Sequence, residues 1–288
     1  MFRTVRMPRF LRRSLRSPRL AVGAIGLLIF LIVAIAPGAF TSQNPATQNL
    51  RARFQPPVWL EEGTAGNPLG TDRLGRDLWS RTLYASRVSI TVGLSSVLIS
   101  GLVGVALGVI AGYFSGLAGT IIMRIADVQL GIPPLLLVIA VAGILGPSLR
   151  NVIIILAISG WVIYARTARG LVLSLKENDF IQGARALGAS HFRVIVKHLV
   201  PNILVPLTVI ASQQMALMIL RESTLSFLGI GVPPDIPTWG SMIADGRVVI
   251  EYAWWVSAIP GLALLTAVLC INFLGDGLRD VLDQRLRM

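Results

Sequence analysis

Long runs of residues without charge constrain this chain more than any other feature of its sequence. The run 88–112 has no charged side chain in 25 positions, and other runs approach that length. A helix needs about 20 apolar residues to cross the hydrocarbon core of a bilayer. Only 14% of the residues are charged, against about a quarter in a typical soluble domain. The sequence therefore predicts an all-α membrane protein rather than a soluble protein with a large core.

We expect six membrane-spanning helices. The fourth is short, and the flanking Arg150 and Arg166 can compensate by snorkelling to the interface. The six ranges are 20–40, 88–112, 128–149, 151–165, 203–220 and 252–275.

Two charges set the start of the third span. Arg124 and Asp127 would each cost about 2.5–3.5 kcal/mol at the bilayer centre, and they lie three positions apart, close enough to pair. We therefore expect 121–131 to be an amphipathic helix at the inner interface. Pro133 and Pro134 then fall inside the span, near its cytoplasmic side.

The basic residues are placed as in a membrane protein oriented by positive charge. The net charge is +12, which by itself would also suit nucleic-acid binding, but the arginines gather before the first span and in loops. Pro8 and Pro18 bracket the N-terminal cluster, which favours a basic helix on the inner membrane surface over a voltage sensor. We also expect an uncleaved first span, because 20–40 is long for a signal peptide and further spans follow. The cluster consists of Arg3, Arg6, Arg9, Arg12, Arg13, Arg16 and Arg19.

Six spans put both termini on one side of the membrane, and the arginine cluster assigns that side to the cytoplasm. On this assignment 166–200 is cytoplasmic, with six basic and two acidic residues, whereas 221–251 is external, with two basic and four acidic residues. The long outer loop 41–87 has six basic and four acidic residues, but long loops count less in this rule.

The usual catalytic motifs are absent from the sequence. It contains no Walker A loop, no Gly-x-Ser-x-Gly elbow and no His-Glu-x-x-His. His191 and His198 have no carboxylate or cysteine companion nearby, so we expect surface roles rather than metal ligation. Cys270, the single cysteine, is expected to be a packed thiol. We expect no catalytic activity, metal or cofactor in this chain, so any energised work must draw on a partner.

Glycines recur every fourth residue at the end of the second span, at 104, 108, 112 and 116. This period leaves a groove along one helix face where another helix can pack closely. The partner helix can belong to the same chain or to another subunit, and the sequence leaves both open.

Residues 177–200, called the hairpin below, read as two short helices joined by a tight turn. The first helix is expected over 177–187, Gly188 is a natural stop, and Ser190 is a natural N-cap for a second helix over 191–199. Pro201 and Asn202 then open the fifth span.

The hairpin combines a face of small residues with basic edges. Gly183, Ala184 and Gly188 fall near one another at helical spacing, which lets a partner's surface approach closely. Arg185, Arg193 and Lys197 add charge at the edges. A solvated basic loop is the plainer interpretation. It explains neither the small residues nor the helix stop at Gly188 and the N-cap at Ser190.

The hairpin resembles the cytoplasmic "EAA" loop in the membrane subunits of binding-protein-dependent ABC importers. That loop reads Glu-Ala-Ala, three residues, Gly, nine residues, then Ile-x-Leu-Pro. Here Gln182, Gly183 and Ala184 stand for the first three residues, and Gly188 and Pro201 match the pattern in kind and spacing.

Three further stretches resemble the dipeptide/oligopeptide/nickel subfamily of these subunits, and specifically its second, C-type permease. They are the segment before the second span (67–90), the external segment after the fifth (222–247) and the C-terminal tail (272–287), where Gln284 stands in place of the usual proline. The resemblance implies a type I importer core at 86–288 with five helices. It is preceded by an N-terminal region, 1–85, that holds the basic segment, the first span and the outer loop.

The resemblance also implies partners in a bacterial cytoplasmic membrane. They are a homologous permease that completes the pathway, two cytoplasmic ABC ATPases that bind ATP and Mg, and an external substrate-binding protein. Nucleic acid is not among them. The hairpin would be the coupling helix that docks on an ATPase, and a carboxylate at Glu177 or Asp179 can make acidic contacts there. The residues assigned to this coupling are Glu177, Asp179, Gln182, Gly183, Ala184, Arg185, Leu187, Gly188, Arg193 and Pro201.

Polar residues at membrane depth are candidates for the translocation pathway. Hydrogen bonding between packed helices is the competing interpretation, and it is slightly favoured for any single residue. Glu222 is expected to pair with Arg221 or with a partner subunit, and Trp239, Trp254 and Trp255 are expected to be interfacial anchors. The candidates are Ser95, Ser96, Ser100, Ser212, Gln213, Gln214, Glu222 and Asn272.

Di- or oligopeptides are the substrates that the resemblance favours, with nickel complexes or other small solutes as the alternative. A stand-alone secondary carrier would need ionisable groups inside its spans. An intramembrane enzyme would need a reactive constellation, and the sequence offers none.

Overall fold

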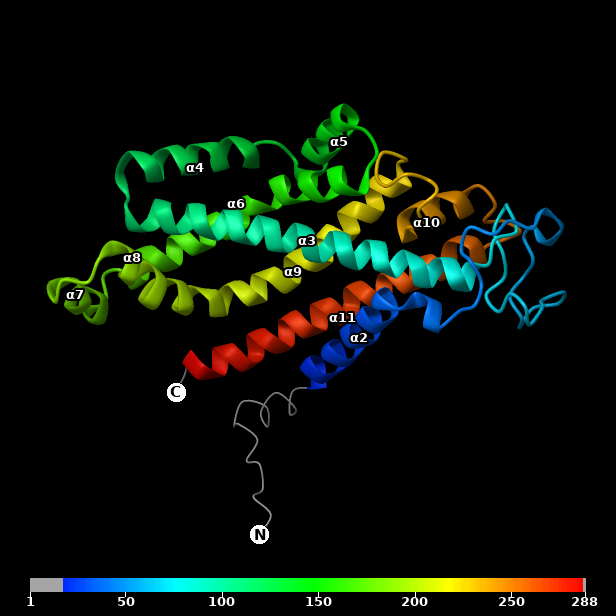
Figure 1. Ribbon diagram of the computed structural model, residues 1–288, viewed down its shortest axis with the longest axis horizontal. Coiled ribbons are helices and arrows are strands. Elements are labelled where there is room, and N and C mark those ends of the chain that lie inside the picture. The colour runs from blue at the N-terminus through cyan, green and yellow to red at the C-terminus, as the bar shows by residue number, and fades with distance from the viewer. Residues whose placement is uncertain (1–17, 287–288) are drawn as a thin grey trace, which may run out of the picture.

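The computed structural model describes residues 18–286, with side chains as far as Val281, and every regular element in this range is helical. Five of its helices are long and apolar enough to cross a membrane. The predicted all-α membrane fold is thus confirmed, while Arg3 to Arg16 of the basic cluster lie outside the described residues. The five helices, seen in Figure 1, are α2 (Pro18–Ile35), α3 (Leu78–Tyr113), α6 (Leu149–Leu175), α9 (Val200–Phe227) and α11 (Trp255–Leu286).

The third predicted span is broken. Helix α4 (Gly116–Leu130) and helix α5 (Pro134–Leu145) meet at an angle of 89°, so a single helix over 128–149 is wrong. The break follows from the sequence, because Gly131 ends α4 and two prolines follow, which cannot donate the backbone hydrogen bonds that would continue it. The chain has six crossings only if this bent pair counts as one of them.

Asp127 on α4 forms its ion pair with Arg166 on α6, and not with Arg124 as its spacing suggested. Both side chains of the pair are about half exposed. A partner 39 positions away fixes α4 to α6, and this contact cannot be read from spacing along one helix.

The glycine period of α3 faces α6 within the same chain. A Cβ at Gly104 would lie 2.4 Å from the Trp161 carbonyl oxygen, and one at Gly108 would lie 2.4 Å from the Ala165 carbonyl oxygen. Gly112 meets Val172 in the same way, whereas Gly116 has open space around it and begins α4 at a φ of +64°. Of the two alternatives, intrachain packing accounts for the first three glycines.

Helix α2 packs along α11, where Gly26 leaves room for the Cys270 sulfur. Cys270 is buried, as expected for a packed thiol. On the other side of the bundle, Gly93 of α3 lies against Ile219 of α9.

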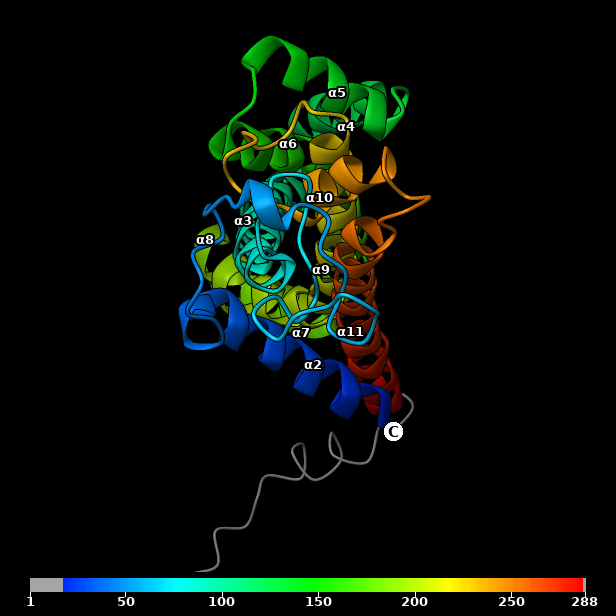
Figure 2. The same cartoon turned by 90° about the vertical axis from the view of Figure 1, so that its right-hand side faces the viewer.

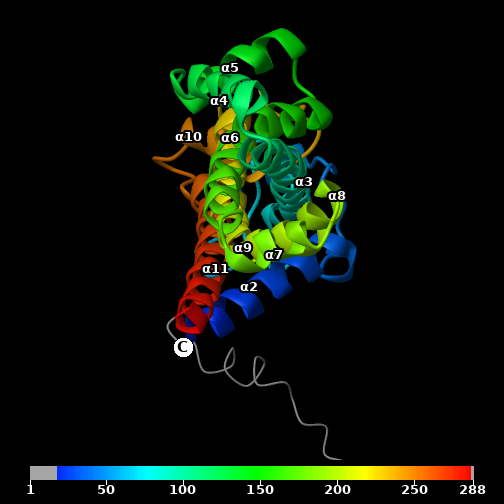
Figure 3. The same cartoon turned by 90° about the vertical axis from the view of Figure 1, so that its left-hand side faces the viewer.

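The two ends of the bundle differ in structure. Figure 3 looks onto the end that carries the hairpin, with α7 (Asp179–Ala186), α8 (His191–Val194) and the π-helical turn η3 (Ile195–Leu199). Figure 2 looks onto the opposite end, where residues 41–77 lie over the ends of the long helices. These residues, called the outer segment below, include the single turn η2 (Leu50–Ala52) and follow another, η1 (Pro37–Ala39).

Charged and aromatic side chains hold together the end of the bundle that carries residues 41–77. Asp72 pairs with Arg76 and Arg81, and Arg76 also pairs with Asp245 of helix α10 (Trp239–Arg247). Trp239 is fully buried and its indole N–H donates to the Thr82 carbonyl at 3.1 Å. The outer segment is therefore a folded cap joined to α3 and α10.

Candidate coupling hairpin and membrane pathway

The turn of the hairpin is built as its sequence predicts. Gly188 has a φ of +82°, which favours glycine, and the Ala189 N–H donates to the Ala184 carbonyl to close the end of α7. The Ser190 hydroxyl accepts from the Arg193 N–H at 3.3 Å, which confirms the predicted N-cap.

The second helix of the hairpin does not end before the membrane. Helix α8 continues through η3 into α9 without a break, so one helix runs from His191 to Phe227. Pro201 lies in the first turn of α9 and has no N–H to donate, and the wider π turn at 195–199 comes directly before it. The separate helix predicted over 191–199 is thus wrong at its far end.

Large apolar side chains of the hairpin project away from the bundle. Leu187 is 91% exposed and Phe192 is 76% exposed, while Phe180 is half exposed. Ideal Cβ atoms at Gly183 and Gly188 meet nothing within 4 Å, so the small-residue face is open. Phe180 and Phe192 were not among the predicted coupling residues, although both are apolar residues in a polar loop.

Charged and polar side chains border this open face. Glu177, Asp179, Arg185 and Arg193 are exposed, as is Gln182, whose amide donates to the Glu177 carbonyl at 3.0 Å. Ala184 is half-buried and Pro201 is exposed. The predicted coupling residues thus gather on one protruding element, and their role in coupling stays a prediction.

The hairpin is fixed firmly to the membrane helices. Ile181, Val194 and Leu199 are fully buried beneath it. The Tyr113 hydroxyl lies 2.8 Å from His191 Nδ1, which joins the hairpin to the end of α3. Lys176 Nζ donates to the Ser115 hydroxyl at 3.1 Å. A displacement of the hairpin would therefore be transmitted to α3, α6 and α9 together.

The predicted pathway residues are divided between the interior and the surface of the chain. Ser96 donates to the Ile153 carbonyl of α6 at 3.3 Å. Ser100 and Ser212 are also buried and bond to carbonyls of their own helices. Ser95, Gln214 and Asn272 are half-buried, and Gln213 is exposed. The buried serines fit the helix-packing alternative, while the role of the others in a pathway stays a prediction.

Glu222 is not paired with Arg221. Its carboxylate is fully buried and accepts from three serine hydroxyls, at 2.8 Å from Ser226 and 3.4 Å from Ser89 and Ser223. The tryptophans also differ from expectation, because Trp239 and Trp255 are core residues rather than interfacial anchors, and only Trp254 is exposed. Ser89 and Thr82 of α3 contact Glu222 and Trp239, and sequence spacing does not reveal these contacts.

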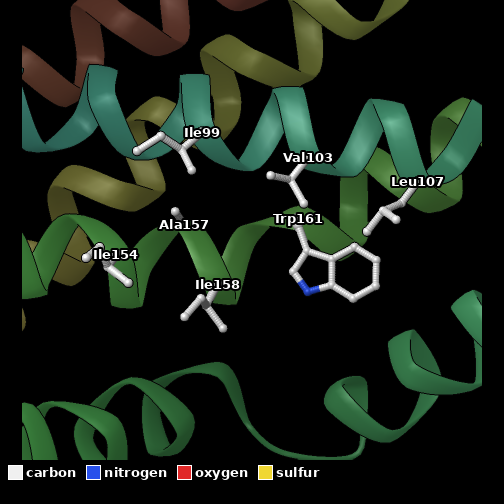
Figure 4. A pocket seen from close by; sticks show the side chains of 7 residues that line it. All are labelled: Ile99, Val103, Leu107, Ile154, Ala157, Ile158 and Trp161. Atoms are coloured by element: carbon white, nitrogen blue, oxygen red, sulfur yellow. The ribbon is translucent and has the colours of Figure 1, made fainter.

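An apolar pocket of about 310 Å³ lies between α3 and α6, and it was not predicted. Trp161 borders it, and the Trp161 indole N–H donates to the Gln129 side chain of α4 at 2.8 Å. Gln129 in turn donates to the Ile158 and Ser159 carbonyls. As Figure 4 shows, the lining side chains are Ile99, Val103, Leu107, Ile154, Ala157, Ile158 and Trp161.

The sequence of the chain is similar to those of known membrane components of transport systems. A family model described as "Binding-protein-dependent transport system inner membrane component" matches residues 104–288. The di/tripeptide transport system permease protein DppC of Pseudomonas aeruginosa is 42% identical over 269 residues, covering 92% of this chain and 89% of that protein. The dipeptide transport system permease protein DppC of Escherichia coli K12 is 41% identical over 272 residues, covering 94% of this chain and 91% of its own length.

A solved structure shares the fold. The chain aligns with a chain from the inward-facing MetNI methionine ABC transporter at a TM-score of 0.53 and 17% identity, covering 67% of this chain and 93% of that one. The helical core of this chain therefore has the same fold as that chain of the transporter.

Proposed function

The chain belongs to the family of binding-protein-dependent transport system inner membrane components, and from this premise we propose that it is the C-type permease of an ATP-driven importer of di- or oligopeptides. Its relatives at about 42% identity are named as peptide or dipeptide permeases, which supports the peptide substrate. The chain is a multi-pass transport subunit. In our proposal, ATP and Mg are bound only by partner ATPases.

The observation that carries this proposal is that the hairpin is exposed while buried side chains anchor it to the membrane helices. A side chain such as Leu187, at 91% exposure, has no packing role in the chain and is available to fill a groove on a partner. Since α8, η3 and α9 form one helix, a displacement of the docked hairpin would tilt α9 directly. Closure of two ATPases on ATP would in this way rock the permease between inward- and outward-open states.

The proposed orientation places the hairpin and both termini in the cytoplasm. Figure 1 supports it, because α11 ends on the side of the bundle that carries α7 and α8. The outer segment then faces the external binding protein, and a homologous permease completes the pathway.

We expect Leu187→Asp to remove coupling without unfolding the permease. A carboxylate at this position would have to be desolvated in an apolar groove of the ATPase, which is costly, whereas the permease itself buries almost none of Leu187. We expect the purified complex to lose its ATPase subunits, or its binding-protein-stimulated ATP hydrolysis to fall about tenfold or more.

Leu117→Asp is the matched control, since Leu117 is also exposed, at 82%, but lies at the start of α4 outside the hairpin. That variant should keep its ATPases and its stimulation. Unchanged association and stimulation in Leu187→Asp, or equal losses in both variants, would contradict the docking role of the hairpin.

A further inference from the structure

Arg221 is a cation inside a membrane-spanning helix. It lies six residues before α9 ends at Phe227, which places it about 9 Å from the outer end of that helix at 1.5 Å per residue. Its guanidinium donates to the Ser159 hydroxyl of α6 at 3.3 Å. Arg221 is half-buried and lies one position beyond the predicted span 203–220. Burying part of a guanidinium without a partner of opposite charge is costly, so the group is a candidate for binding an anion.

No carboxylate in the described part of the chain neutralises Arg221. The neighbouring Glu222 is held by serine hydroxyls of α3 and α9. Asp127, the acidic residue on the nearby helix α4, is already paired with Arg166. A single neutral hydroxyl uses little of the hydrogen-bonding capacity of a guanidinium, which has five donors.

A row of polar contacts leads from this arginine to the apolar pocket between α3 and α6. Ser159, which accepts from Arg221, also offers its backbone carbonyl to Gln129, and Gln129 accepts from Trp161 at the pocket wall. Ile158, adjacent to Ser159 in the chain, lines the pocket as well. Arg221 and the apolar pocket are therefore connected by one continuous row of polar contacts across α9, α6 and α4.

We propose that Arg221 and this pocket form a binding position for the C-terminal end of a peptide, in which the guanidinium binds the carboxylate and the pocket takes an apolar side chain. The proposal rests on the proposed function and narrows its substrate class to solutes with a free carboxylate. A planar guanidinium matches a carboxylate with two parallel hydrogen bonds. The pocket, at about 310 Å³, is at the small end of the range for ligand sites and suits part of a peptide rather than all of it.

The test uses the complete transporter in proteoliposomes, with both permeases, the ATPases and the binding protein. Uptake of labelled Leu-Leu is compared with uptake of its C-terminal amide, each at a concentration that saturates the binding protein, and is normalised to ATP hydrolysed. The wild type should import the acid about tenfold more efficiently than the amide, the size expected for one charge-assisted contact. Arg221→Gln should remove this preference, and Arg221→Lys should keep part of it.

Arg150→Gln is the control, because Arg150 is an exposed arginine in the first turn of α6, outside the pocket and the row of polar contacts. It should keep the wild-type preference. An Arg221→Gln variant that keeps the preference, or that lowers uptake of both solutes equally, would overturn the proposal. Loss of the second permease from the purified Arg221→Gln complex would also overturn it, because the carboxylate would then belong to that subunit. Absence of Leu-Leu uptake by the wild type would instead contradict the proposed function itself.

Discussion

Replacement of Gly108 by leucine is expected to prevent helix α3 from packing on α6, so that little folded protein can be extracted from the membrane. A Cβ at this position would lie 2.4 Å from the Ala165 carbonyl oxygen and 2.8 Å from the Ala168 Cβ. Neither atom belongs to a flexible side chain that could move aside. The helices would have to separate along the whole contact, and in lipid the packing of closely approaching helices is a main source of their association.

The yield and thermal stability of the variant in mild detergent, followed by size-exclusion chromatography, measure this effect. Gly101→Ala is the matched control on the same helix, because its added methyl group would lie 3.7 Å from the Tyr164 ring, an ordinary contact. We expect wild-type behaviour from the control and aggregated or degraded protein from Gly108→Leu. Overpacking in a well-filled core typically costs about 1–3 kcal/mol, and clashes with backbone atoms cost more. A monodisperse Gly108→Leu protein of normal stability would mean that the glycine face does not hold α3 on α6.

The features that sequence analysis predicted correctly depend on neighbours close in the chain. The turn of the hairpin is an example, because Gly188 and Ser190 set its backbone through contacts within a few residues. The long apolar helices are another, because each uncharged run is continuous in the sequence. Their lengths were not predicted, since α6 covers Leu149–Leu175 where a short span over 151–165 was expected. The glycine period of α3 also identified a packing face, but its partner helix lies more than fifty residues away and had to come from the structure.

The predictions are wrong where the structure depends on the direction of a helix or on a partner that is distant in the sequence. Hydropathy identifies apolar segments but does not give the direction of the helices that they form. It therefore could not show that α4 and α5 meet at 89°. Asp127 and Glu222 were assigned the nearest opposite charge in sequence, whereas the fold offers Arg166 to the first and serine hydroxyls to the second. The pocket beside Trp161 is formed by α3 and α6 together, so neither segment alone signals it.

The second large effect is expected at the outer end of the bundle, where Asp72→Asn should detach the outer segment from α3. Asp72 is 2% exposed, and its carboxylate accepts from Arg76 Nε at 2.6 Å and from the Arg76 N–H at 3.0 Å, with Arg81 Nε at 3.5 Å. Arg76 and Arg81 are themselves buried. Loss of this carboxylate leaves Arg76 with Asp245 as its remaining ion-pair partner at 3.6 Å and removes the ion pair of the buried Arg81. Breaking a buried pair in this way costs about 3–5 kcal/mol.

Hydrogen exchange of the amides in 41–77 and in the first turn of α3 measures this loss. Because local opening sets the exchange rate, a loss of about 3 kcal/mol should speed exchange more than a hundredfold, while amides at the hairpin end stay protected. Asp235→Asn is the control, since Asp235 is an exposed carboxylate on the same side of the bundle. Protection at wild-type levels in Asp72→Asn would show that the two arginines are neutralised by other groups. The outer segment would then be held on α3 by other contacts, such as the hydrogen bond from the Leu78 N–H to the Gly70 carbonyl.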